Sequence, residues 1–93
     1  MTSDGSPSAP ETRDCVQIQV YARAQGSMVP PQLMNPDRNW TVKLFTKVAT
    51  RSLGVRMDAP VAYKFSSNKP LDPATTLAEA DLLPYEMLEF RSA

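Results

Sequence analysis

Residues 60–91 constrain the fold of this 93-residue chain more than any other stretch. They begin with an alternating apolar and polar run over 61–65, which is typical of a strand with one buried face. A polar turn and a brief strand at 70–71 follow, and the pattern at 76–79 is that of a capping box that opens one helical turn. A second alternating run at 86–91 closes the stretch. We therefore expect strand, turn, short helix and strand, in that order.

The alternation also predicts which side chains of this half face the core. In the run over 61–65 we expect Tyr63 and Phe65 to point inward. The capped turn is expected to bury Leu77 together with a leucine that follows it. The predicted core residues of this half are Tyr63, Phe65, Leu77, either Leu82 or Leu83, Leu88 and Phe90.

Two strands are predicted before the helix. The first covers 15–23, and a turn at 24–27 follows, in which Gly26 supplies a positive φ. The second covers 28–33, and its Pro30-Pro31 pair lacks amide donors, so that this strand belongs at a sheet edge. The first strand is expected to turn Cys15, Val16, Ile18 and Val20 toward the core and Gln17, Gln19 and Tyr21 outward.

A helix is predicted between these strands and the 60–91 stretch. Asn35 is a good N-cap, and Pro36 is tolerated at the first helical position. We expect the helix to end at Ser52 or Leu53, before the left-handed cap Gly54. Its apolar stripe is predicted to consist of Trp40, Leu44, Phe45, Val48, Ala49 and Leu53, and its solvated face of Arg38, Lys43, Lys47 and Arg51.

Residues 1–14 differ in composition from the rest of the chain. After Met1 they contain no large apolar residue and are rich in Ser, Pro and charge. Such a segment buries too little surface to offset the entropy lost on ordering. The sequence therefore predicts a disordered tail over 1–14 and one domain over 15–93.

The overall composition excludes several classes of partner. Ten Lys and Arg residues balance ten Asp and Glu residues, and recruitment of nucleic acid or an anionic membrane needs a surplus of positive charge. No apolar stretch approaches the ~20 residues that span a bilayer. The N-terminus also lacks the basic and apolar regions of a secretory signal. We expect neither nucleic acid nor membrane as a partner.

Two further features of the composition bear on chemistry. The chain has no histidine, which is the commonest general base and metal ligand, and its single Cys15 lacks a partner for activation. A structural zinc site, which needs about four Cys or His ligands, is excluded. We predict a protein that is not an enzyme, without metal, cofactor or small-molecule substrate. The lone cysteine favours a reducing, cytoplasmic setting.

The order of residue types at 69–82, Lys-Pro-Leu-Asp-Pro-Ala-Thr-Thr-Leu-Ala-Glu-Ala-Asp-Leu, resembles ubiquitin without a gap. The resemblance is strongest over 69–91 and extends over most of 15–91. It implies the α+β class and a ubiquitin-like β-grasp fold. In that fold a mixed sheet of four or five strands, in the order 2-1-5-3, carries one central helix on one face. Fold alone leaves function open, because β-grasp proteins have many roles.

The sequence departs from ubiquitin in ways that matter for function. Ubiquitin-type modifiers end in Gly-Gly, whereas this chain reads Phe-Arg-Ser-Ala at 90–93. The apolar surface by which receptors bind ubiquitin is expected to be absent, because Lys64 and Arg91 occupy the outward positions near it. The loop at 54–60 and the prolines of the second strand have no ubiquitin counterpart. A sulfur carrier, which needs the terminal Gly-Gly, is disfavoured, and a ferredoxin, which needs four cysteines, is excluded.

Two functions remain. The first is a ubiquitin-like protein modifier with an unconventional C-terminus, in which Ser92 and Ala93 are the conjugation residues. An adenylating, ubiquitin-activating-type enzyme and a conjugating enzyme would be its partners. The second is a non-conjugated ubiquitin-like interaction module, such as an adaptor or a secretion-system accessory protein.

The residues predicted to make contacts follow from these two functions. Lys69 falls where ubiquitin has a chain-linking lysine, although turns carry lysines regardless of function. Outward side chains of the first and last strands form the predicted partner surface, because Tyr and Arg often anchor interfaces. An ordinary solvated sheet face is the alternative for the same residues. The candidate surface consists of Gln17, Gln19, Tyr21, Lys64, Glu89 and Arg91.

Overall fold

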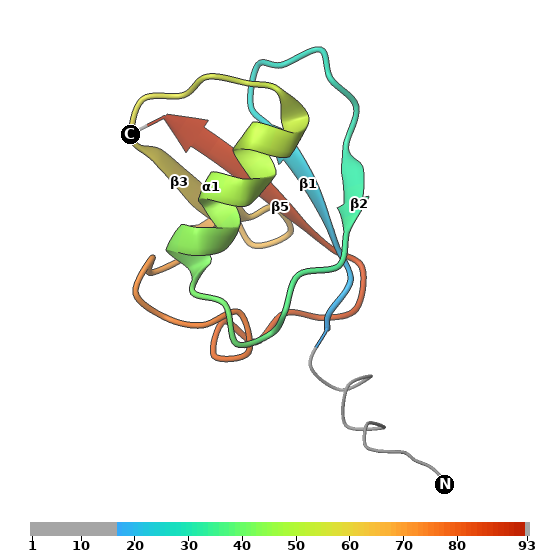
Figure 1. Ribbon diagram of the computed structural model, residues 1–93, viewed down its shortest axis with the longest axis vertical. Helices are drawn as coiled ribbons and strands as arrows, with labels where there is room; N and C mark the ends of the chain where they lie inside the picture. The colour runs from blue at the N-terminus through green and yellow to red at the C-terminus, as the bar shows by residue number, and fades with distance from the viewer. Residues whose placement is uncertain (1–16, 93) are drawn as a thin grey trace, which may run out of the picture.

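The computed structural model describes residues 17–92, in which one mixed sheet of five strands carries one helix on one of its faces (Figure 1). The elements in chain order are β1 (Val20–Ala24), β2 (Gln32–Met34), α1 (Val42–Leu53), β3 (Pro60–Lys64), β4 (Lys69–Pro70) and β5 (Glu86–Ser92). The predicted tail at 1–14, Cys15 and Ala93 lie outside the described residues. Over 17–92 no helix is long and apolar enough to cross a bilayer.

The strand order is β2-β1-β5-β3-β4. β1 and β5 run parallel, with Val20 beside Glu86 and Ala24 beside Phe90, and the other neighbours are antiparallel. The predicted α+β class, the helix and the order 2-1-5-3 are confirmed, with β4 added beside β3. This is the ubiquitin-like β-grasp arrangement that the resemblance implied.

The first two strands are shorter than predicted. β1 begins at Val20, and Gln17 makes an isolated bridge to Asp37 instead of joining the ladder. β2 begins at Gln32, directly after Pro30 and Pro31. Since prolines cannot donate to the ladder, pairing starts only where backbone amides become available. The edge position predicted for this strand is confirmed.

The core lies between α1 and the sheet. Phe45 of α1 meets Phe90 of β5, with ring centroids 6.0 Å apart, and both side chains are fully buried. Leu77, from the capped turn, is buried beside them as predicted, as is Leu88. The other buried apolar residues are Val20, Ala22, Ala24, Val42, Ala49, Leu53 and Ala62.

The predicted start of the helix is wrong. α1 begins at Val42, and Thr41 is its N-cap, with the hydroxyl accepting a hydrogen bond from the Leu44 amide at 3.1 Å. Asn35 lies in a loop. The backbone between Asn35 and Thr41 bonds to the capped turn, where the amides of Leu77 and Ala78 donate to carbonyls of residues 40 and 38. These carbonyls therefore accept hydrogen bonds from the capped turn, and not from amides further along a helix that would start at Asn35. The predicted end is confirmed, since Gly54 adopts the left-handed conformation, with φ 72°.

The buried stripe of α1 also differs from the prediction. Leu44 and Val48 are 41% and 38% exposed. Phe45, Ala49 and Leu53 are buried as predicted. Val42 and Thr46 complete the buried stripe. Together, the five buried residues follow the i, i+3, i+4 spacing of one helix face.

The predicted orientation of β3 is wrong as well. Ala62 pairs with Phe90 and faces the core, so Tyr63, opposite Glu89, faces away from α1. Phe65 follows on that same side and is 46% exposed. A period of two identifies two faces without saying which is buried. Here the small Ala62 fits beneath the helix.

The N-cap can be tested by substitution. Thr41→Ala removes the acceptor for the Leu44 amide and is expected to lower the free energy of unfolding by about 1 kcal/mol. Asn35→Ala, at the cap position that the sequence favoured, is the matched control and should leave stability almost unchanged. Urea denaturation followed by circular dichroism measures both. A larger loss for Asn35→Ala would contradict the observed start of α1.

Candidate functional site

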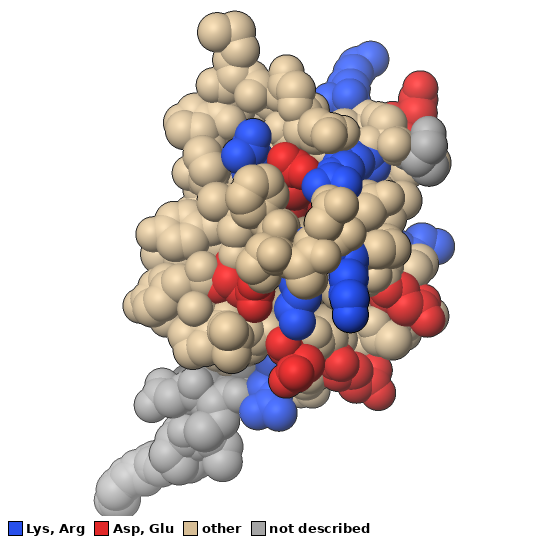
Figure 2. Space-filling model, turned by 180° about the vertical axis from the view of Figure 1, so that it is seen from behind, with Lys and Arg blue, Asp and Glu red and all other residues tan. Residues whose placement is uncertain are grey.

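The sheet face opposite α1, here called the open face, is the candidate site. No helix of the described residues covers it, because α1 packs on the other side (Figure 1). Figure 2 shows this side of the molecule, on which basic and acidic side chains lie among a larger uncharged surface. The residues of the open face are Tyr21, Arg23, Leu33, Val61, Tyr63, Phe65, Tyr85, Met87, Glu89 and Arg91.

One row of the open face is apolar and partly exposed, and we call it the apolar row. Leu33 lies beside Tyr21, and Tyr21 lies beside Met87 across the ladder. Phe65 extends the row, because its amide donates to the Met87 carbonyl at 3.1 Å. The Tyr85 ring lies 6.4 Å from that of Tyr21. The apolar row therefore offers aromatic and aliphatic side chains to a partner, on a face that also carries the predicted outward residue Arg91.

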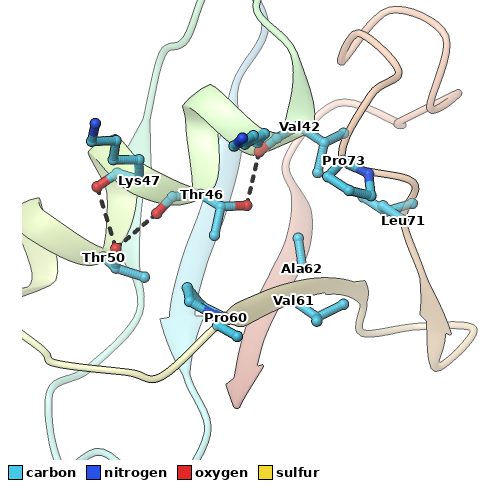
Figure 3. A pocket seen from close by; sticks show the side chains of 11 residues that line it. Val42, Thr46, Lys47, Thr50, Pro60, Val61, Ala62, Leu71 and Pro73 are labelled. Atoms are coloured by element: carbon cyan, nitrogen blue, oxygen red, sulfur yellow. Dashed lines mark hydrogen bonds between the residues drawn. The ribbon is translucent and has the colours of Figure 1, made fainter. Parts of the chain in front are cut away.

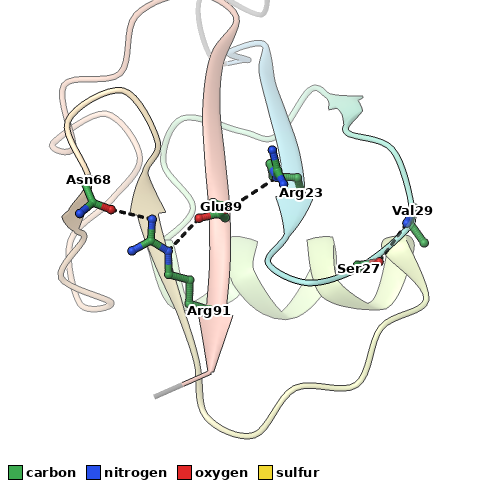
Figure 4. A network of polar contacts seen from close by, with 6 residues as sticks. All are labelled: Arg23, Ser27, Val29, Asn68, Glu89 and Arg91. Atoms are coloured by element: carbon green, nitrogen blue, oxygen red, sulfur yellow. Dashed lines mark hydrogen bonds and ion pairs between the residues drawn. The ribbon is translucent and has the colours of Figure 1, made fainter.

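A row of charges, the charged row, runs beside the apolar row. Glu89 of β5 is only 5% exposed, although it lies on the face without a helix. Its carboxylate is 3.3 Å from Arg23 Nε and 2.8 Å from Arg91 Nε (Figure 4). Arg91 Nη2 also donates to Asn68 Oδ1 at 2.6 Å. Two guanidinium groups thus cover one carboxylate, which leaves the charged row with a net positive charge.

Aromatic rings hold both arginines in place. The guanidinium carbon of Arg23 lies 5.4 Å from the centroid of the Phe65 ring, and that of Arg91 lies 4.1 Å from the centroid of the Tyr63 ring. Such cation–π contacts contribute about 0.5–1 kcal/mol each at exposed sites. Together with Glu89 they restrict the two long side chains before any partner arrives, which lowers the entropy lost on binding.

The predicted surface residues divide between the open face and other places. Tyr21, Glu89 and Arg91 lie together on the open face. Gln17 and Gln19 are exposed but precede β1, beside a small cavity of about 190 Å³. Lys64 pairs with Leu88, whose side chain is in the core, so the placement of Lys64 with the others is wrong.

Two residues predicted for conjugation, Lys69 and Ser92, lie in different strands, Lys69 in the edge strand β4 and Ser92 in the central strand β5. Lys69 is exposed in β4 and pairs with Lys64. Ser92 is the last residue of β5 and pairs with Pro60. Neither residue lies in the apolar row or the charged row.

Sequence reasoning missed several residues of the open face. Arg23 continues the outward alternation after Tyr21, so that this signal was present in the pattern. Tyr63 and Phe65 were assigned to the wrong face of β3. Tyr85 has φ 61° in the turn before β5, and no periodic pattern marks such a position. Among residues 17–92, no three His, Cys, Asp or Glu side chains gather in a way that suits a metal ion.

Comparison with known proteins identifies the fold. No protein-family model matches the chain, and no curated protein matches it. Caldiarchaeum subterraneum ubiquitin is similar to it with a TM-score of 0.69 at 10% identity, over 83% of this chain and 94% of that one. A chain of a toluene 4-monooxygenase HD complex with the inhibitor 4-bromobenzoate gives 0.68 at 22% identity, over 83% and 99%.

A third similar structure belongs to a larger protein. It is a chain of a pParkin–pUb–UbcH7 complex, with a TM-score of 0.68 at 19% identity, over 84% of this chain and 23% of that one. Identities this low establish the ubiquitin-like β-grasp fold and nothing finer. Proteins with this fold are typically non-enzymatic, although one similar chain comes from a monooxygenase complex.

Proposed function

We propose, from the premise that this chain is a ubiquitin-like β-grasp domain, that it is a protein-interaction module. Its partner binds the open face, with apolar side chains against the apolar row and an acidic group near the charged row. No covalent bond is made or broken in this role. The domain supplies a preformed binding surface. The lone cysteine agrees with action in a reducing, cytoplasmic setting.

The observation that carries the proposal is the arrangement around Glu89. An ordinary solvated sheet face has no reason to bury a carboxylate, since water stabilises the charge better than a protein interior does. Here Glu89 is buried because Arg23 and Arg91 cover it. Tyr, Phe and Arg are enriched at protein interfaces, and this face concentrates all three within two adjacent rows.

One similar structure agrees with a role in assemblies. The chain of the pParkin–pUb–UbcH7 complex is part of a multi-protein structure. An adaptor or accessory protein needs a stable surface and no catalytic group. Both requirements fit a domain in which the side chains of the open face are held by contacts within the domain.

A ubiquitin-like modifier is the second candidate, and the similarity to Caldiarchaeum ubiquitin favours it. In that role Ser92 and Ala93 would react with an activating enzyme, and Lys69 would accept a further copy. Ser92 is paired with Pro60 in the sheet, so the end of β5 has to detach before an enzyme can enclose this segment. That cost makes the interaction module the better-supported function.

An adenylation experiment separates the two candidates. The chain is incubated with ATP and an activating-type enzyme encoded beside its gene, and the products are analysed by intact mass. An interaction module keeps its mass unchanged. An adenylate or a conjugate that depends on Ser92 and Ala93 would contradict the module and establish the modifier.

A further inference from the structure

A groove of about 560 Å³ lies between α1 and β3, on the side of the sheet that carries the helix (Figure 3). The helix supplies one wall, and β3 with the segment after β4 supplies the other. The residues that line this α1–β3 groove are Val42, Lys43, Thr46, Lys47, Thr50, Ala59, Pro60, Val61, Ala62, Leu71 and Pro73.

The groove exists because small side chains meet there. β3 turns Ala62 toward the helix, while its aromatic residue Tyr63 faces the open side. α1 contributes Thr46 opposite this strand. β4 pairs only with Tyr63 and Lys64, so on that side of β3 no strand of residues 17–92 lies beside Pro60, which pairs with Ser92 of β5 on the other side. The side chains and backbone that would fill this space are therefore supplied by no part of the described chain.

The polar groups of the groove point to the charge of its occupant. The hydroxyls of Thr46 and Thr50 donate to helix carbonyls, Thr46 to Val42 O at 2.8 Å and Thr50 to Thr46 O at 2.8 Å. Lys43 and Lys47 are exposed and have no ion-pair partner within residues 17–92. No acidic side chain lines the groove. An occupant therefore meets apolar surface and two uncompensated positive charges.

The spacing of the two lysines suits an extended chain. Lys43 and Lys47 are four positions apart in α1, which is about 6 Å along the helix axis. In an extended segment, residues i and i+2 point to the same side and lie about 6.6–6.8 Å apart. Two acidic residues flanking one apolar residue would therefore face the two lysines, while the apolar residue faces Ala62 and Leu71 on the opposite wall.

We propose that the α1–β3 groove binds an extended acidic segment of a partner protein, with the pattern acidic, apolar, acidic. The carboxylates pair with Lys43 and Lys47, and the apolar side chain covers Ala62 and Leu71. This contact is separate from the open face, because the sheet lies between them. The domain can then engage its partners from both sides.

The test uses the blocked peptide Leu-Asp-Val-Asp-Leu and the isotope-labelled full chain. Amide chemical shifts should change at Lys43, Lys47, Ala62 and Leu71, and raising the salt should weaken binding. The double variant Lys43→Gln/Lys47→Gln should bind about five- to thirty-fold more weakly. The control variant Arg51→Gln/Arg56→Gln also removes two positive charges, but outside the groove. It should leave the affinity within about two-fold of the wild-type value.

Three results would overturn the proposal. One is equal affinity for the uncharged peptide Leu-Asn-Val-Asn-Leu, because charge complementarity would then play no part. Another is a set of shift changes confined to the open face, which would place the peptide on the arginines of the charged row. The third is saturation of the groove by decanoate without any binding of the peptide, which would identify a site for small amphipathic carboxylates instead.

Discussion

Replacing Phe90 by alanine should lower the free energy of unfolding by about 3–5 kcal/mol, the usual effect of removing a buried phenylalanine. The side chain is fully buried and packs on Phe45 at 6.0 Å between ring centroids. A domain of this size is stable by only about 5–15 kcal/mol, so the variant should be partly or wholly unfolded. Urea denaturation followed by circular dichroism gives the difference.

Phe65→Ala is the matched control for that experiment. Both residues are phenylalanines in or beside the sheet, but Phe65 is 46% exposed and contacts Arg23 on the open face. Its removal should cost about 1 kcal/mol or less. Equal losses for the two variants would contradict the observed orientation of β3, in which Ala62, and not Phe65, faces the core.

Tyr21→Asp should weaken binding of the partner by about thirty-fold or more, as expected when a central aromatic anchor is lost. Tyr21 lies at the middle of the apolar row, between Leu33 and Met87 and near the Tyr85 ring. An aspartate there places a charge among apolar groups that the partner would bury. Affinity is measured by biolayer interferometry with the partner isolated on the wild-type domain.

Leu44→Asp is the control for the loss of an exposed apolar residue. Leu44 is 41% exposed and Tyr21 is 36% exposed, but Leu44 lies on α1, on the other side of the sheet. Thermal unfolding of both variants verifies that each remains folded. A partner that loses affinity for Leu44→Asp and keeps it for Tyr21→Asp binds somewhere other than the open face.

Much of the fold could be predicted from the sequence, because local signals agree along the chain. The capping box at 76–79 is present, with Thr76 accepting from the Glu79 amide and the Glu79 carboxylate accepting from the Thr76 amide. Gly54 ends the helix, and the prolines hold β2 at an edge. Each of these features is determined by residues that are close together in the sequence. Local sequence patterns carry information over that short range.

The errors occurred where distant segments decide the outcome. The sequence favoured Asn35 as the cap, but the helix begins after Thr41, and the segment between them instead accepts hydrogen bonds from Leu77 and Ala78 of the capped turn. The orientation of β3 depends on pairing with β5, because a shift of one residue exchanges the two faces. Neither the cap nor the register can be read from its own segment.

The candidate site was predictable only in part. Tyr21, Glu89 and Arg91 were expected on the exposed side of the first and last strands; they lie on the open face, but Glu89 is only 5% exposed. The burial of Glu89 could not be predicted, because it requires Arg23 from β1 and Arg91 from β5 at once. Surface residues also obey weaker patterns than core residues, since exposure allows almost any polar side chain.

The central claim is that the open face, and not the C-terminal residues, is what this domain uses. It is tested by one comparison of partner affinity among the wild-type chain, Tyr21→Asp and a chain lacking Ser92 and Ala93. The account predicts that Tyr21→Asp loses the partner and the shortened chain keeps it. Loss of the partner by the shortened chain, with full affinity retained by Tyr21→Asp, would contradict the account.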